Sequence, residues 1–134
     1  MRIIAGKHSG YILKQPMLEP TRPTTDIAKE ALFSSIDNYF NFDNIRFLDL
    51  FGGTGNISYE FASRGCEDIT TVEIFPKAIN FIKNTSEKLQ LKGHTILQMD
   101  VFQYINSCSD FTILVLPHPL SPAINIPLLI FGSV

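Results

Sequence analysis

Residues 45–56, IRFLDLFGGTGN, hold the pattern that decides the fold. An apolar run of strand length leads into a loop with Gly52, Gly53 and Gly55, and Asn56 then opens a helical segment. Glycine adopts backbone conformations that are closed to other residues and lets a ligand approach the main chain. The free N–H groups of the following helix would face such a ligand. The stretch therefore predicts a buried strand, a ligand-binding glycine loop and a helix.

Strand-like and helix-like segments alternate beyond this loop. Further strands are predicted for 68–74, 94–100 and 111–116, and helices for 56–65, 76–91 and 101–107. Gly65 and Pro76 lie where a helix ends and begins, respectively. Short apolar strands that alternate with helices are typical of an α/β fold, in which helices cover both faces of a doubly wound parallel sheet.

The segment before the first strand predicts a smaller unit. Two β-type runs, Arg2–Ala5 and Tyr11–Lys14, indicate a hairpin with a long loop, and prolines then mark an extended connector. A helix is expected from about Thr25 to about residues 38–41, with Thr24 or Thr25 as its cap. Its predicted apolar face is Ile27, Ala28, Ala31, Leu32 and Ile36. The expected organisation is a hairpin and basic arm (1–23), a Rossmann-like domain (24–116) and an apolar, proline-rich tail (117–134).

Composition places the chain in a broad class. Its 134 residues favour one domain, and no apolar run is long enough to predict a membrane span. Charge and glycine within residues 2–13 argue against a signal peptide. The two cysteines, Cys66 and Cys108, are far apart and predict reduced thiols in a cytoplasmic protein.

The charge is unevenly spread. The net charge is −2, but residues 1–23 carry a local +3 from Arg2, Lys7, Lys14 and Arg22 against Glu19. A basic arm on an acidic body suggests a polyanionic partner at one end. A solvated terminus explains the same charges, so composition alone leaves both interpretations open.

An acidic residue stands near the end of each of the first three predicted strands. A carboxylate at Asp49 repels phosphate but suits a cationic amine. Glu73 is placed to accept hydrogen bonds from ribose hydroxyls, and Asp100 to accept one from an adenine amine. Together they fit S-adenosylmethionine. The predicted cofactor-binding residues are Asp49, Phe51, Gly52, Gly53, Gly55, Asn56, Glu73, Ile74, Asp100 and Val101, and no metal site is predicted.

The same residues admit two alternatives to this cofactor. A dinucleotide fingerprint starting at Gly53 would need a third glycine at position 58, which is Ser58. Asp49 would also lie poorly beside a pyrophosphate. A purely structural glycine turn is the other alternative, and the acids at successive strand ends argue against it.

Four stretches resemble the bacterial 16S rRNA (guanine-N2)-methyltransferase family. These RsmD-like proteins are class I S-adenosylmethionine-dependent methyltransferases. They are MRIIAGKHSGYILKQP (1–16), TRPTTDIAKEALFSSI (21–36), FLDLFGGTGNISYEFASRG (47–65) and VEIFPKAINFIKNT (72–85). The resemblance implies a Rossmann-like methyltransferase sheet, S-adenosylmethionine as donor, and 16S rRNA or a small ribosomal subunit particle as partner. The residues it suggests for RNA contact are Arg2, Lys7, Lys14, Arg22 and Thr24.

The resemblance also implies an Asp/Asn-Pro-Pro-Tyr motif at the end of the fourth strand, where the base is held. Positions 117–120 are instead Pro117, His118, Pro119 and Leu120, so no catalytic residue is predicted. Methyl transfer by this chain is expected to be impaired, and the alternative is a non-catalytic module that binds cofactor or RNA. The family's later strands are expected to be missing, which would expose the fourth strand unless PLLIFGSV (127–134) pairs with it.

Overall fold

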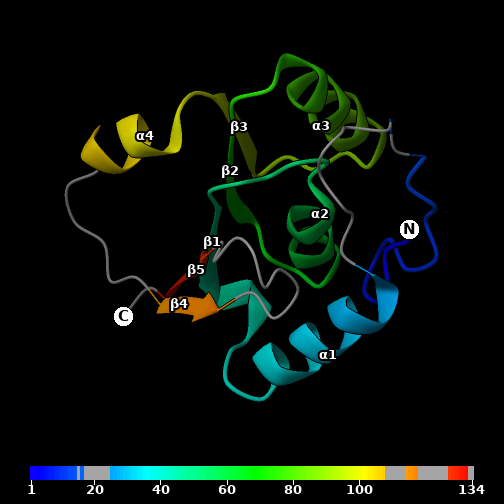
Figure 1. The fold of residues 1–134 in the computed structure, drawn as a ribbon. Coiled ribbons are helices and arrows are strands. Elements are labelled where there is room, and N and C mark those ends of the chain that lie inside the picture. The colour runs from blue at the N-terminus through cyan, green and yellow to red at the C-terminus, as the bar shows by residue number, and fades with distance from the viewer. Residues whose placement is uncertain (15, 17–24, 108–113, 118–126, 133–134) are drawn as a thin grey trace.

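The computed structural model describes residues 1–14, 16, 25–107, 114–117 and 127–132. Strands and helices alternate from the first strand to the fourth, as predicted (Figure 1). The helices are α1 (Asp26–Asp37), α2 (Asn56–Ser63), α3 (Pro76–Lys88) and α4 (Val101–Ser107), and a short 3-10 helix, η1, spans Phe42–Asn44. The strands are β1 (Ile45–Asp49), β2 (Asp68–Glu73), β3 (His94–Gln98), β4 (Leu114–Pro117) and β5 (Pro127–Gly132).

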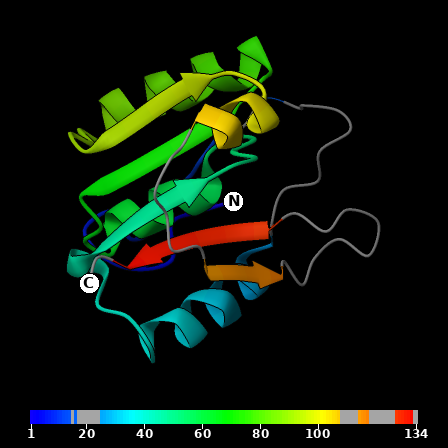
Figure 2. The same cartoon turned by 90° about the vertical axis from the view of Figure 1, so that its left-hand side faces the viewer.

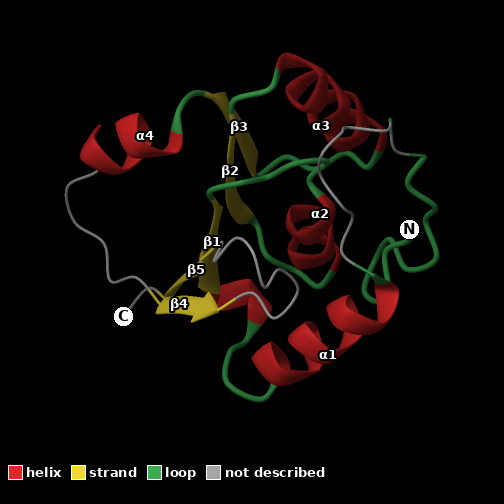
Figure 3. Ribbon diagram, viewed as in Figure 1, coloured by secondary structure: helices red, strands yellow, loops and turns green. Residues whose placement is uncertain are grey.

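Three neighbouring strands form the parallel part of the sheet. β1 pairs with β2 and β2 with β3, all parallel, so their carboxyl ends meet at one edge. Helices α2 and α3 lie against one face and α4 against the other (Figures 1 and 3). The Rossmann-like arrangement predicted from the alternating pattern is confirmed for this part of the chain.

The sheet beyond β1 differs from the prediction. The alternating pattern predicts a purely parallel sheet that includes β4. The fourth strand does run in the direction of β1, but β5 lies between them and is antiparallel to both (Figure 2). The sheet order is therefore β3-β2-β1-β5-β4. The alternative in which the terminal segment pairs with the fourth strand is confirmed for Pro127–Gly132. An antiparallel return needs only a loop between β4 and β5, whereas a parallel neighbour needs a long crossover.

The N-terminal hairpin is confirmed in a reduced form. A single antiparallel bridge joins Arg2 and Ile12, and the N–H of Ile3 donates to the carbonyl of Tyr11 at 3.0 Å. The buried side chains of Ile3 and Leu13 pack on Tyr59, Ile82 and Leu89. The hairpin is thereby fixed to the layer of α2 and α3.

The apolar face predicted for α1 is wrong in part. Thr25 caps the helix as expected, accepting from the N–H of Ala28 at 3.3 Å. The buried positions are Lys29, Phe33 and Ile36, whereas the side chain of Ile27 is 82% exposed. The aromatic rings of Phe42 and Phe61 lie on the Phe33 side of the helix, so packing rather than apolar spacing sets which face is buried.

Two apolar clusters flank β1. Phe47 stacks on Phe61 of α2, with ring centroids 3.7 Å apart, in the cluster that also holds α1. Leu48 and Leu50 point to the other face and pack with Val72 and Val101 under α4. This alternation fixes Asp49, between the two leucines, on the α2 face of the sheet.

Candidate cofactor site

The glycine loop joins β1 to α2 at the carboxyl edge of the parallel strands. Gly53 and Gly55 have φ angles of +53° and +78°, in the region that favours glycine. Gly55 is the N-cap of α2 and offers no side chain to the free N–H groups of the first turn. A Cβ atom on Gly55 would lie 2.7 Å from the Tyr59 hydroxyl. The loop is therefore a tight turn that leaves a bare helix N-terminus.

Asp49 lies at the base of this loop and is 8% exposed. Its Oδ2 accepts a hydrogen bond from the Ser58 hydroxyl at 2.9 Å, and the Phe51 N–H also contributes. Burial raises the pKa of Asp49 to about 6, the two hydrogen bonds oppose that rise, and the charge of Glu73 adds to it. Within the described residues no cation neutralises this carboxylate, which leaves it suited to a cationic ligand group.

Glu73 ends β2 and closes the loop from the neighbouring strand. Its Oε2 accepts from the Gly53 N–H at 2.8 Å, and its Oε1 accepts from the N–H groups of Ile74 and Phe75 at 2.7 and 3.0 Å. An ionised carboxylate has about four acceptor positions. One therefore remains for a ligand while the loop keeps this conformation.

The third strand end carries Asp100, whose Oδ1 accepts from the N–H groups of Phe102 and Gln103. The acid thus caps α4, a structural role that the strand-end pattern did not reveal. Val101 is buried beside it, whereas the rings and chains of Phe51, Ile74 and Phe102 are 46%, 52% and 72% exposed. Each of the three follows shortly after the end of a parallel strand, and we call these exposed apolar side chains the apolar rim.

Asn56, the first residue of α2, turns its side chain away from the loop. Its Oδ1 accepts from Lys29 Nζ at 2.9 Å, and the same ammonium bonds Glu60 Oε2 at 2.9 Å and the carbonyl of Arg2 at 2.8 Å. Lys29 and Glu60 are 0% exposed. The buried pair joins α1, α2 and the N-terminal hairpin. Sequence reasoning missed it, because isolated charges on amphipathic helices ordinarily indicate a solvated face.

The basic residues predicted to meet RNA have different surroundings. Arg2 Nε lies 3.3 Å from Asp26 Oδ2 in an exposed ion pair, whereas Lys7 and Lys14 are exposed. Arg22 and Thr24 lie outside the described residues, as do His118, Pro119 and Leu120 of the expected base-binding motif. Pro117 ends β4. Cys66 is buried with a free thiol, and Cys108 is not described.

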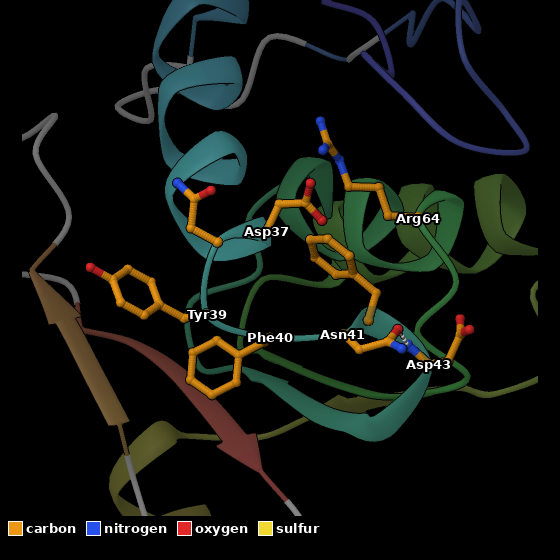
Figure 4. Close-up of a pocket in the computed structure, with 8 residues that line it drawn as sticks. Asp37, Tyr39, Phe40, Asn41, Asp43 and Arg64 are labelled. Atoms are coloured by element: carbon orange, nitrogen blue, oxygen red, sulfur yellow. Dashed lines mark hydrogen bonds between the residues drawn. The ribbon is translucent and has the colours of Figure 1, made fainter.

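An open depression of about 480 Å³ lies at the opposite end of β1 (Figure 4). It is lined by residues between the end of α1 and η1, and by Arg64 beyond α2. In its wall the Asn41 side chain accepts a hydrogen bond from the Asp43 N–H at 3.2 Å. The glycine loop and the acidic strand ends are at the other edge of the sheet, so this depression is separate from the candidate site.

Among the residues that the structure describes, no helix is long and apolar enough to cross a membrane. The same residues contain no group of three or more His, Cys, Asp or Glu side chains that could hold a metal ion.

A glycine loop at the carboxyl edge of a parallel sheet, beside an acid at the end of the second strand, is typical of a Rossmann-like fold. The family model described as "Conserved hypothetical protein 95" matches residues 1–117. The chain belongs to this family, the RsmD-like methyltransferases, and the resemblance seen in the sequence motifs is confirmed.

Individual relatives agree with this assignment. "Putative rRNA methyltransferase YlbH" of Bacillus subtilis (strain 168) is 43% identical over 94 residues, 70% of this chain and 50% of the relative. "Ribosomal RNA small subunit methyltransferase D" of Buchnera aphidicola subsp. Baizongia pistaciae is 30% identical over 105 residues, 78% of this chain and 53% of the relative. The chain spans about half the length of these curated relatives.

A solved structure supports the fold. The hypothetical protein TTHA0928 of Thermus thermophilus matches with a TM-score of 0.70 and 30% identity, covering 79% of this chain and 59% of that one. The shared part includes most of the described residues.

Proposed function

We propose that the carboxyl ends of β1, β2 and β3 bind S-adenosylmethionine. The observation that carries this proposal is Asp49, a buried carboxylate without a cation among the described residues, beside a helix N-terminus that no side chain caps. A dinucleotide would bring a pyrophosphate to that point, next to two carboxylates that repel it. An amino group is the ligand charge that Asp49 stabilises.

We assign the remaining contacts with the cofactor, those to its ribose and its base, to the ends of β2 and β3. Glu73 accepts a hydrogen bond from the ribose at its unused acceptor position, and further ribose contact requires release of the Gly53 N–H. Asp100 and the backbone of Val101 face the base edge, and the apolar rim of Phe51, Ile74 and Phe102 covers its faces. The exposure of that rim fits a surface that a planar aromatic ligand buries.

The proposed acceptor is a guanine N2 amine of 16S rRNA, by analogy with the relatives named for small-subunit rRNA methylation. S-adenosylmethionine, when bound, supplies an electrophilic methyl group on sulfur, which an amine nitrogen attacks in line. Holding the amine requires a hydrogen-bond acceptor and an aromatic surface beside the cofactor. Residues 117–120 provide neither an acid nor an amide, and Leu120 stands where the motif has its aromatic residue, so we propose that this chain transfers methyl groups poorly.

A non-catalytic module that retains cofactor or RNA binding is the second candidate, and the sequence of residues 117–120 is the observation that favours it. Methyl transfer from radiolabelled S-adenosylmethionine to small-subunit RNA and to immature small subunits distinguishes the two. The Bacillus subtilis relative serves as the comparison enzyme. Incorporation at a guanine N2 at a comparable rate would refute impairment, and cofactor binding without incorporation supports the module.

A further inference from the structure

A chain of hydrogen bonds runs from Asp49 through the layer between the sheet and the helices α2 and α3. Ser58 Oγ lies 2.9 Å from Asp49 Oδ2 and 2.8 Å from Thr71 Oγ1. Thr71 Oγ1 lies 2.7 Å from His94 Nε2, and the Nδ1 of His94 lies 2.7 Å from Ser86 Oγ. The five side chains come from β1, α2, β2, β3 and α3. Ser58 and Thr71, in the middle, are 0% exposed.

The chemistry of these groups sets the direction of every bond. An ionised Asp49 only accepts, so the single Ser58 hydroxyl hydrogen points to it. Thr71 must then donate to Ser58, and its oxygen accepts from an N–H at His94 Nε2. A neutral imidazole has one N–H, so its Nδ1 accepts from Ser86. The hydrogen bonds therefore all run in one direction, from Ser86 toward Asp49. This direction requires the Nε2–H tautomer of His94.

The surroundings favour this neutral tautomer. Burial lowers the pKa of His94 to about 4, so the ring is uncharged at neutral pH. The ring of Tyr59 meets the imidazole edge-on, with centroids 6.3 Å apart. Both ring nitrogens of His94 contact hydroxyl groups, those of Thr71 and Ser86, so among the described residues no carboxylate is bonded to the ring to favour a second proton.

Thr71 also contacts the glycine loop directly. A Cβ atom on Gly52 would collide with the Thr71 methyl group, and the Gly52 N–H donates to the carbonyl of Val72 at 3.2 Å. The same side chain therefore supports the loop through its methyl group and the Asp49 chain through its hydroxyl. Substitution can separate these two contributions.

We propose that His94 is a positioning residue for the cofactor site, acting through Thr71 and Ser58. Because the Nε2–H of His94 donates to Thr71, the hydroxyl hydrogens of Thr71 and Ser58 both point toward Asp49. This arrangement keeps the Asp49 carboxylate ionised and in place for the amino group of S-adenosylmethionine. This inference rests on the proposed cofactor. It assigns a role to three residues outside the predicted site, one of which, Ser58, stands where a dinucleotide fingerprint would place glycine.

The test compares two ligands that differ at the amino group. S-adenosylmethionine carries the amino acid moiety, and 5′-methylthioadenosine lacks it but keeps the adenosine and the sulfur. Thr71→Val removes the hydroxyl and keeps the shape, whereas Thr71→Ser keeps the hydroxyl and removes the methyl group under Gly52. Calorimetric titration of both ligands into the wild type and the two variants measures each contribution.

We expect Thr71→Val to weaken S-adenosylmethionine binding up to about tenfold, the usual range for losing a hydrogen bond between neutral groups, here the one from Thr71 to Ser58. Its affinity for methylthioadenosine should stay within about twofold, because that ligand has no amine for Asp49 to bind. Thr71→Ser should keep the wild-type ratio between the two affinities. Equal weakening of both ligands by Thr71→Val, or no weakening of either, would overturn the positioning role. Failure of the wild type to bind either ligand refutes the proposed cofactor instead.

A second measurement does not depend on a variant at Thr71. Nitrogen NMR of the imidazole rings, with His94→Gln to assign the signal, reports the tautomer of His94 in the intact chain. We expect the Nε2–H form alone at pH 7. An Nδ1–H form, or exchange between the two tautomers, would show that the hydrogen bonds do not run in the inferred direction. Either result would overturn the proposal.

Discussion

The Oε2 atom of Glu73 accepts a hydrogen bond from the backbone N–H of Gly53 at 2.8 Å. The acid at the end of β2 therefore holds the glycine loop that follows β1, and the same carboxylate is the proposed ribose acceptor. The proposed ribose contact would therefore couple ligand binding to the conformation of the loop through these two residues. A ribose that takes both hydroxyl contacts must displace the Gly53 N–H from Glu73.

We predict that Glu73→Gln weakens S-adenosylmethionine binding by roughly 10- to 100-fold, the range for hydrogen bonds to a charged acceptor. The amide has one acceptor atom in place of two, so it cannot serve Ile74, Phe75 and Gly53 together. Calorimetry measures the affinity, and Glu87→Gln, an exposed change on α3, is the matched control. Unchanged affinity in the Glu73 variant would show that the ribose is not held by this acid.

The buried pair of Lys29 and Glu60 leads to a prediction about stability. Burial alone would raise the pKa of Glu60, but hydrogen bonds from the Ile4 N–H and from Lys29 bring it below its ordinary value. We expect Lys29→Met to reduce the free energy of unfolding by about 3 kcal/mol, because Glu60 then stays buried with Arg64 as its remaining cation.

Urea denaturation measures this loss, with the exposed change Lys83→Met as control. The double variant Lys29→Met with Glu60→Gln should recover part of the stability, since it removes the buried charge that Lys29 neutralises and keeps an amide oxygen for the Ile4 or Ala5 N–H. A Lys29→Met variant as stable as the wild type would mean that the buried pair does not hold the hairpin, α1 and α2 together.

Asp49 gives a prediction with a defined pH dependence. Because its pKa in the folded state, about 6, exceeds the ordinary value of 3.8, the folded chain binds a proton more readily than the unfolded one. The ionised carboxylate therefore destabilises the fold at pH 7, and this cost disappears as the pH falls from 6 to below 3.8.

The neutral variant Asp49→Asn should accordingly be more stable than the wild type at pH 7, by on the order of 1–3 kcal/mol. The difference should shrink toward pH 4, and Glu87→Gln should show no such trend. Denaturant titrations at several pH values give the two curves. A variant that is less stable than the wild type at pH 7 would indicate that Asp49 stabilises the fold rather than a ligand.

The proposed RNA contact makes a prediction about salt. Lys7 and Lys14 are exposed, whereas Arg2 is paired with Asp26. Each phosphate contact to single-stranded RNA adds about 0.7 to the slope of log affinity against log salt concentration. The double variant Lys7→Ala with Lys14→Ala should reduce the magnitude of that slope by about 1.4 for a small-subunit rRNA fragment. The control variant Lys83→Ala should leave the slope unchanged. An unaltered slope in the double variant would remove these lysines from the interface.

The sequence predicts most of the fold because the signals are local. The glycine loop, Pro76, Gly65 and the short apolar runs each specify an element from neighbouring residues, and the order of β1 to α4 follows them. The position of β5 between β1 and β4 could not be predicted in this way. Strand pairing between distant segments depends on which partner is present in space, and an apolar stretch such as 127–132 carries no record of its neighbour.

The residues of the candidate site could likewise be predicted only where the signal is local. Asp49, Glu73 and Asp100 stand at strand ends, so topology alone brings them to one edge of the sheet. The contacts of Ser58 and His94 depend on side chains from three other elements, β1, β2 and α3, which sequence spacing does not reveal. Their one visible signal was a serine in the first helical turn after the glycine loop.

The most direct test of the account is a calorimetric titration of the purified chain with S-adenosylmethionine, beside an Asp49→Ala variant. We predict saturable binding by the wild type and its loss in the variant, with both chains unfolding cooperatively in urea. A folded wild-type chain that does not bind S-adenosylmethionine, or a variant that binds it equally well, would contradict the claim that these strand ends form the cofactor site.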